Sequence, residues 1–233
     1  QGVLPSWKPL AAGEGGIVAT NDRELYERAL IYCHLHRTGA VEELTNPVYK
    51  QMDPQLLGWK WRAHPFALAI SQIALRNLPY RIENFTKHRN ELFHRIRDIP
   101  GLRPVHVYPK SKGAELFGGL QFLVDADALG GAGAPEITQA LRAEGLTGVT
   151  NEARHIEHLR AIYTRDLPGL WGQGHVGPAD QPLPRYKRGD FPVTESVAAR
   201  SFRFTGWIEP APGLIEQIAA AFEKVSAHAS ELV

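Results

Sequence analysis

The hydrophobic and polar positions of this chain follow helix-like and strand-like periods in turn, which predicts a mixed α/β protein. Near the start, the apolar run Ile17-Val18-Ala19 predicts a short buried strand over 16–20. Asn21 is a suitable N-cap for a helix that follows and extends to about Cys33. Apolar residues at helical spacing predict the buried stripe of that helix: Leu25, Ala29 and Tyr32.

The middle of the chain predicts two helices separated by a proline. Pro65 suits the first turn of a helix, because its missing N–H needs no partner there. Apolar residues then follow at helical spacing as far as Pro79, which is expected to end or kink the helix. A second helix is expected over 81–97.

The remaining pattern predicts a smaller α+β unit with helices on one face of a sheet. Strands are expected over 102–108, 118–125, 146–149 and 201–205. Helices are expected over 136–144, stopped by Gly145, from Phe191 to Glu195 onward with Thr194 as cap, and from Pro212 to the end. A long loop over 151–189 contains or adjoins His155, His158 and His175, and we interpret it as a rim or lid on the substrate side.

Composition narrows the classes of protein to which the chain can belong. Its 233 residues are 43% hydrophobic, enough for one large or two small cores. Lys+Arg 26 against Asp+Glu 25 implies no strongly basic face, so no nucleic-acid partner is expected. The single cysteine, Cys33, allows no internal disulfide and favours a reducing cytoplasm. No apolar run approaches the roughly 18–20 residues that cross a bilayer, so no membrane association is expected.

The start of the chain carries two further signals. The only methionine is Met52, and the chain begins Gln1-Gly2. The first motif, which begins at Lys8 and is described below, follows within a few residues. We therefore expect this 233-residue chain to be the C-terminal part of a longer protein.

His34 and His36 alternate in a way that could suit a metal. No partner stands at ligand spacing, so we expect a polar active-site or dimer loop and no metal.

Lys8 is the first candidate for chemistry. It stands between Trp7 and Pro9, and Pro9 favours an extended backbone at Lys8. A glycine-rich turn follows at 13–16, where glycine permits conformations closed to other residues. Such an amine could form a Schiff base with an aldehyde cofactor or a carbonyl substrate. The alternative is a surface lysine before a hairpin turn.

The segment Lys8-Pro-Leu-Ala-Ala-Gly-Glu-Gly-Gly resembles the lysine motif of the DegT/DnrJ/EryC1/StrS family. These are pyridoxal-phosphate-dependent sugar and cyclitol aminotransferases of fold type I. The resemblance implies that Lys8 carries pyridoxal 5'-phosphate as an internal aldimine. Family members usually have a phosphate-binding serine five residues before the lysine. Val3 stands there in this chain, and the nearest serine is Ser6, which we expect to contact the cofactor phosphate.

A second segment, Gly58-Trp-Lys-Trp-Arg62 followed by a helix rich in small residues, is similar to the family's G-x-N-x-R pattern. Lys60 replaces the asparagine. The resemblance implies that this loop reaches the partner subunit's active site in a homodimer with shared sites. Lys60 is then expected at the cofactor phosphate, and the substrate contacts are expected from Arg62, Trp61 and His64. The alternatives are a structural ion pair for Arg62, and an amphipathic loop with tryptophans in the core and cations in solvent.

The resemblance implies an α/β fold, the C-terminal part of an aspartate aminotransferase-like transferase. Residues 1–80 would end the large cofactor-binding domain, with the lysine loop and long helix, and 81–233 would form the C-terminal α+β small domain. It implies amino transfer from an amino acid, with glutamate or glutamine as common donors, to a keto sugar or keto cyclitol. Retention of Lys8 argues against the family's dehydratase branch.

Two other functions are weighed. A non-catalytic binding or interaction domain is suggested by the departures at Val3 and Lys60. Direct attack of Lys8 on a carbonyl substrate, as in class I aldolases, would need alternating βα units that this pattern lacks.

Overall fold

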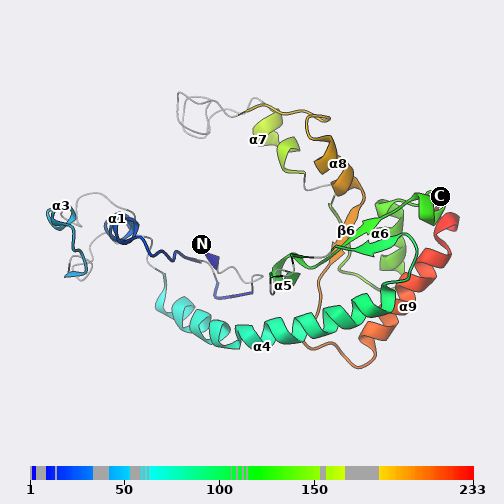
Figure 1. The fold of residues 1–233 in the computed structure, drawn as a ribbon, viewed down its shortest axis with the longest axis horizontal. Helices are drawn as coiled ribbons and strands as arrows, with labels where there is room; N and C mark the ends of the chain where they lie inside the picture. Colours follow the sequence, from blue (N-terminus) through cyan, green and yellow to red (C-terminus); the bar gives the residue numbers. More distant parts are fainter. Residues whose placement is uncertain are drawn as a thin grey trace. The chain divides into compact units, whose positions relative to one another are not determined.

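The computed structural model describes residues 2–3, 9–13, 15–33, 42–52, 59, 61, 63–105, 107–108, 110–111, 113, 115–152, 156–165 and 184–233. They form two compact units, Gln1–Tyr80 and Arg81–Val233. One helix, α4 (Pro65–Ile96), contributes residues to both units (Figure 1). No helix in the described part of the chain is both long and apolar enough to span a membrane.

The first unit contains a two-stranded antiparallel ribbon. Strand β1 (Gly2–Val3) pairs with β2 (Gly16–Ile17), with Val3 opposite Gly16. The expected buried strand over 16–20 is therefore wrong in length and in burial, since the side chain of Ile17 is 42% exposed. A ribbon of two short strands has no second layer on which to bury a face.

Helix α1 (Arg23–Cys33) begins one residue later than its predicted cap implies. The Asp22 carboxylate accepts hydrogen bonds from the backbone N–H groups of Glu24 (2.9 Å) and Leu25 (3.1 Å). These are the second and third helical positions, which an N-cap side chain satisfies. Asp22 is therefore the N-cap, and the prediction of Asn21 is wrong.

The buried residue of α1 is a carboxylate, Glu27, at 1% exposure, whereas Leu25 of the predicted apolar stripe is 52% exposed. Glu27 accepts hydrogen bonds from the N–H (2.8 Å) and hydroxyl (2.5 Å) of Thr45, from the N–H of Asn46 (3.0 Å) and from Arg23 (2.7 Å). Led by the Thr45 hydroxyl, these bonds lower the pKa of Glu27 to about 2. Glu27 thus attaches α1 to the segment that precedes α3 (Pro47–Lys50).

Helix α4 begins at Pro65, as predicted, but continues through Pro79 to Ile96. The expected pair of helices is therefore wrong. Beyond the proline, Phe85, Leu92 and Ile96 are buried in one core cluster. Burying each such side chain contributes about 1.5–3 kcal/mol, which together outweighs the ~3 kcal/mol for a proline inside a helix.

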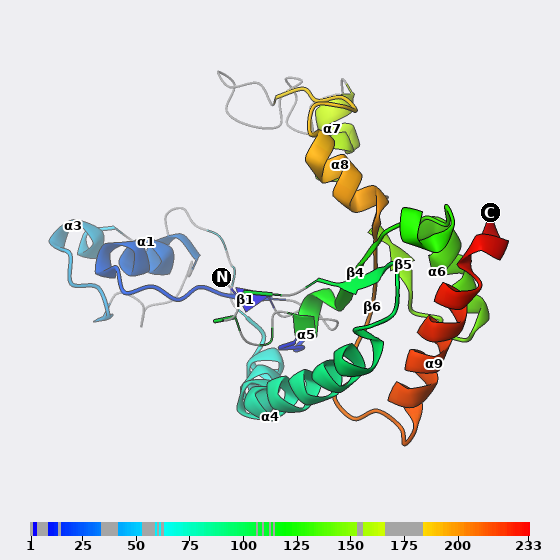
Figure 2. The same cartoon turned by 45° about the vertical axis from the view of Figure 1, so that its right-hand side comes forward.

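A four-stranded antiparallel sheet forms the centre of the second unit, in the order β3-β4-β6-β5 (Figure 2). The strands are β3 (Leu102–Pro104), β4 (Leu120–Val124), β5 (Thr150–Asn151) and β6 (Ser201–Phe204). Three of these strands lie within or close to the predicted ranges. The strand expected over 146–149 is wrong, because the chain turns there and pairs with β6 only from Thr150.

Short helices connect the strands and two longer helices cover the sheet. They are α5 (Glu115–Gly118), η1 (Asp127–Leu129), α6 (Ala134–Ala143), η3 (Glu157–Leu159), α7 (Ala161–Thr164), α8 (Pro192–Ala199), α9 (Leu214–Ala227) and η4 (Ala229–Leu232). Helices α6 and α9 were predicted nearly to their bounds, and they contact each other (Figure 1). Thr194 is not a cap, since it lies inside α8, which Phe191 precedes.

Phe122 lies at the centre of the second unit's core and is fully buried. Its ring centroid lies 5.1 Å from Phe202, 5.5 Å from Phe204 and 5.2 Å from Phe222. The neighbours belong to β6 and α9, so one side chain joins two strands and a helix. Side chains of α4 and α6 complete the same cluster.

Replacing Phe122 with alanine should lower the free energy of unfolding by about 3–5 kcal/mol, because a large buried ring leaves a cavity. Urea unfolding followed by circular dichroism measures the change. Tyr108→Ala is the control, since that ring is 86% exposed and its loss should change stability by less than about 0.5 kcal/mol. Equal losses in the two variants would contradict the described core.

The acid stability of the first unit should depend on Glu27. Because folding lowers its pKa from 4.5 to about 2, its contribution is fully present above pH 4.5 and is lost as the pH falls from there toward 2. Glu27→Gln should lower stability near neutral pH and flatten its dependence on pH over this interval. Urea midpoints measured across the interval test this. The control is Glu24→Gln, whose exposed side chain pairs with Arg28 at the surface and should leave the dependence almost unchanged.

Candidate active site

The loop that contains Lys8 is closed at its base by the β1–β2 ribbon. Lys8 and Ser6 lie outside the described residues, but both ends of their segment are described. The pairing of Val3 with Gly16 brings together the two ends of the segment 4–15, which is twelve residues long. Gly13 has φ +85°, a left-handed conformation that favours glycine. The predicted glycine turn after Lys8 is therefore confirmed at this residue.

The second predicted segment is attached to the end of α1. Lys60 and Arg62 lie outside the described residues, whereas Trp59 and Trp61, on either side of Lys60, are described. The backbone N–H of Trp59 donates to the carbonyl of Tyr32 (2.7 Å), and that of Trp61 donates to the carbonyl of Cys33 (3.2 Å). The last carbonyls of a helix lack partners within it. The segment around Lys60 uses them as its anchor.

The two tryptophans form an exposed aromatic group with Tyr32. The Trp59 indole N–H donates to the Tyr32 hydroxyl at 2.7 Å, and the two indole rings stack at 5.8 Å. Trp61 also meets Tyr32 edge-on at 6.1 Å. Trp59 is 53% and Trp61 65% exposed, so the alternative that places both rings in a core is wrong. The exposed ring of Trp61 remains accessible to a ligand.

His64 has a structural role that the sequence did not indicate. Its Nδ1 accepts a hydrogen bond from the backbone N–H of Phe66 (3.2 Å), so it caps the helix that begins at Pro65. Nδ1 is therefore unprotonated, and the ring proton of the neutral side chain is on Nε2. Only Nε2 is left for the substrate contact predicted for this residue.

A buried histidine–carboxylate pair lies in the second unit. His158 Nε2 and Glu195 Oε1 are 2.9 Å apart, and the N–H of Gly189 donates to the same oxygen at 2.8 Å. The bond to His158 is the main cause of the lowered pKa of Glu195. Phe191 packs against the imidazole at 4.7 Å. His158 therefore joins the start of the expected substrate-side loop to α8, and it is 9% exposed rather than on an open rim.

The structure does not place the other histidines that the sequence analysis named. His34, His36, His155 and His175 lie outside the described residues. Among the residues that are described, no group of three or more histidine, cysteine, aspartate or glutamate side chains could hold a metal ion. Burial raises the pKa of the Cys33 thiol, which disfavours the reactive thiolate.

Comparisons with solved structures show the same fold in larger proteins. A DegT DnrJ EryC1 StrS aminotransferase from Brucella abortus is 17% identical, with a TM-score of 0.65 over 95% of this chain and 49% of that chain. S. venezuelae DesV in complex with a ketimine intermediate is 16% identical, with a TM-score of 0.69 over 96% and 50%. E. coli GDP-4-keto-6-deoxy-D-mannose-3-dehydratase with bound hydrated PLP is 15% identical, with a TM-score of 0.64 over 93% and 52%.

The chain thus spans about half the length of these structures and has part of their α/β fold, as predicted. A search of curated proteins found no match. The model of the DegT/DnrJ/EryC1/StrS aminotransferase family matches residues 6–161, a range that includes both predicted motifs. By that match over more than half of its length, the chain belongs to the DegT/DnrJ/EryC1/StrS aminotransferase family.

Proposed function

We propose that this chain is part of a pyridoxal-phosphate-dependent aminotransferase that transfers an amino group from an amino acid to a keto sugar or keto cyclitol. Glutamate or glutamine is the proposed donor. The observation that carries the proposal is Lys8 in a loop with joined ends, followed by a left-handed glycine, within a range that matches an aminotransferase family.

The two units have different proposed roles. Residues 1–80 would be the end of the large cofactor-binding domain, and 81–233 the small domain. The proposed enzyme is a cytoplasmic homodimer with shared active sites. In that dimer, Lys60 and Arg62 of each subunit would act in the other subunit's site.

The described residues near both motifs fit a cofactor site. The β1–β2 pairing and the left-handed Gly13 limit the freedom of the Lys8 loop, and a restrained loop can hold one amine in a fixed place. The anchoring of Trp59 and Trp61 to α1 likewise restrains the backbone around Lys60. When bound, pyridoxal phosphate supplies an aldehyde that takes up an amine and an electron sink for the donor's reacting carbon.

The side chains would divide the remaining work. The Lys8 Nζ would hold the cofactor through its aldehyde carbon. Once a donor amine takes that place, the freed Nζ would carry a proton from the donor's α-carbon to the former aldehyde carbon. The Ser6 hydroxyl would donate a hydrogen bond to the cofactor phosphate, and the Lys60 ammonium group would place a positive charge beside it.

The substrate contacts would come from the second motif. Arg62 would bind a carboxylate through two parallel hydrogen bonds. The exposed ring of Trp61 offers an apolar face for a sugar ring, and His64 can donate from Nε2, because Nδ1 caps α4.

Lys8→Ala should abolish amino transfer in the protein that carries this chain, because no other amine would replace Nζ in the proton transfer. The unaltered protein should be yellow, and borohydride should fix the cofactor to the peptide that contains residue 8, as mass spectrometry would show. Lys50→Ala removes an exposed lysine of the same unit and should leave colour and activity unchanged. A colourless protein that gains no absorbance from added cofactor would indicate a non-catalytic domain instead.

Shared sites predict complementation between two inactive variants. Lys8→Ala and Arg62→Ala subunits, mixed and allowed to exchange, should recover about a quarter of wild-type activity, since random pairing leaves one intact site in half of the dimers. Steady-state rates after mixing measure this. The control mixes Lys8→Ala with the double variant, which leaves no intact site. No recovery in the first mixture would place Arg62 in its own subunit's site.

A further inference from the structure

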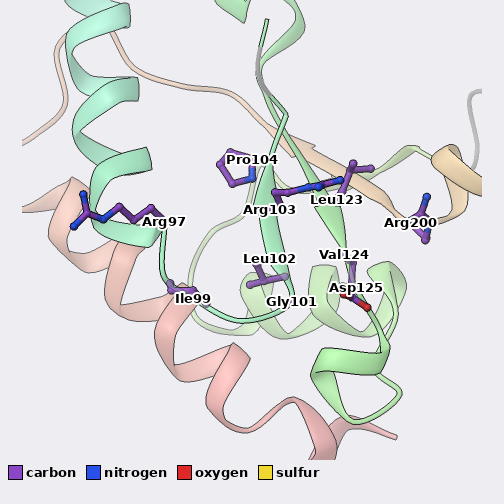
Figure 3. Close-up of a pocket in the computed structure, with 10 residues that line it drawn as sticks. All are labelled: Arg97, Ile99, Gly101, Leu102, Arg103, Pro104, Leu123, Val124, Asp125 and Arg200. Carbon is purple, nitrogen blue, oxygen red and sulfur yellow. The ribbon is translucent and has the colours of Figure 1, made fainter.

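A pocket of about 440 Å³ lies at the β3–β4 side of the sheet in the second unit (Figure 3). Pro104 of β3 and Leu123 of β4 are its partly exposed apolar residues, whereas the side chains of Leu102 and Val124, which also line it, are buried in the core. The volume lies in the range of about 300–1,000 Å³ that is usual for small-molecule sites. All lining residues belong to one unit, so the pocket does not depend on how the two units are arranged.

The charged residues that line the pocket are three arginines and one aspartate. Arg97 is bonded to Asp98 (3.1 Å), and its side chain extends away from the other lining residues in Figure 3. The guanidinium groups of Arg103 and Arg200 have no hydrogen-bond or ion-pair partner among the residues that the structure describes. Against them stands one carboxylate, Asp125, so the pocket carries excess positive charge.

The backbone of the sheet holds both free arginines in place. Arg103 is the cross-strand partner of Leu123, and Leu123 is in turn the partner of Ser201, which follows Arg200. The Val124 N–H also donates to the Arg200 carbonyl at 2.8 Å. Arg103 and Arg200 therefore flank β4 from opposite sides, and their backbones are fixed by hydrogen bonds between strands.

We propose that this pocket binds the phosphate group of a small phosphorylated molecule between Arg103 and Arg200. A guanidinium group matches the geometry of phosphate oxygens and binds them through parallel hydrogen bonds. A doubly charged phosphate would neutralise both free arginines, whereas one carboxylate would neutralise one. The apolar wall of Pro104 and Leu123 would contact the body of the molecule. The proposal goes beyond the transfer reaction and does not rest on Lys8.

Calorimetric titration of the 233-residue chain at low salt tests the phosphate site, with inorganic pyrophosphate as the probe. Arg103→Gln and Arg200→Gln should each raise the dissociation constant about tenfold or more, because each removes charge-assisted hydrogen bonds. Lys87→Gln removes an exposed charge on α4, away from the pocket, and should change it less than about twofold. Equal weakening in all three variants, or no binding by the unaltered chain, would overturn the proposal.

Asp125→Asn provides a test with the opposite sign. Removing the one carboxylate of the pocket should tighten pyrophosphate binding about two- to fivefold, since an exposed charge at this range contributes up to about 1 kcal/mol. Misfolding cannot produce tighter binding. Weaker binding by this variant would show that the carboxylate itself contacts the ligand, and would overturn the proposal that the pocket binds a phosphate group.

Titrations with ADP and adenosine distinguish the contribution of the phosphate to binding from that of the rest of the ligand. Tighter binding of ADP than of pyrophosphate, with adenosine not binding, would support contact of the body with the apolar wall. Equal affinity of ADP and pyrophosphate would keep the phosphate site and overturn that contact. Binding of adenosine alone would overturn the role of the two arginines.

Discussion

The second unit depends on the burial of Phe122 against Phe202, Phe204 and Phe222. The four rings come from two neighbouring strands and the last helix, so one cluster determines which strand lies beside β4 and which face α9 covers. Helix α4 joins the same cluster through Phe93, whose ring meets Phe122 at 5.8 Å. A core built this way is complete within residues 81–233, and the arginine pocket lies on a sheet that this core holds rigid.

The first unit is held by polar contacts instead. Few of its described residues have buried apolar side chains. Its most buried carboxylate, Glu27, accepts hydrogen bonds from Arg23 of α1 and from Thr45 and Asn46, which precede α3. A buried carboxylate is stabilising only while every oxygen has partners. Helix α1 transmits this support, because its final carbonyls bind Trp59 and Trp61. The candidate site therefore rests on a network that protonation weakens.

Local patterns predicted the longer helices, with α4 divided in two, but neither the short helices nor the pairings between distant residues. The five buried residues of α9 follow from helical spacing alone: Ile215, Ile218, Ala219, Phe222 and Val225. Pro79 misled the prediction, because a local rule against proline ignores the packing gained on the far side of it. His158 with Glu195, and Arg103 with Arg200, are brought together by the fold from 37 and 97 residues apart. No periodicity along the chain reports such contacts.

For the candidate site, the sequence predicts the residues but not the contacts that support them. The lysine motif and the glycines that follow it indicated the family from one short stretch, and the match of the family model confirms it. The supports of that site are not local: the β1–β2 pairing joins residues that the lysine loop separates, and the Trp59 backbone bonds to a helix 27 residues earlier. Closing a loop of twelve residues at its base limits the volume that its side chains explore. In sequence, Lys8 and Lys60 each stand between backbone groups that hydrogen bonds hold in place, and a cofactor site needs supports of this kind.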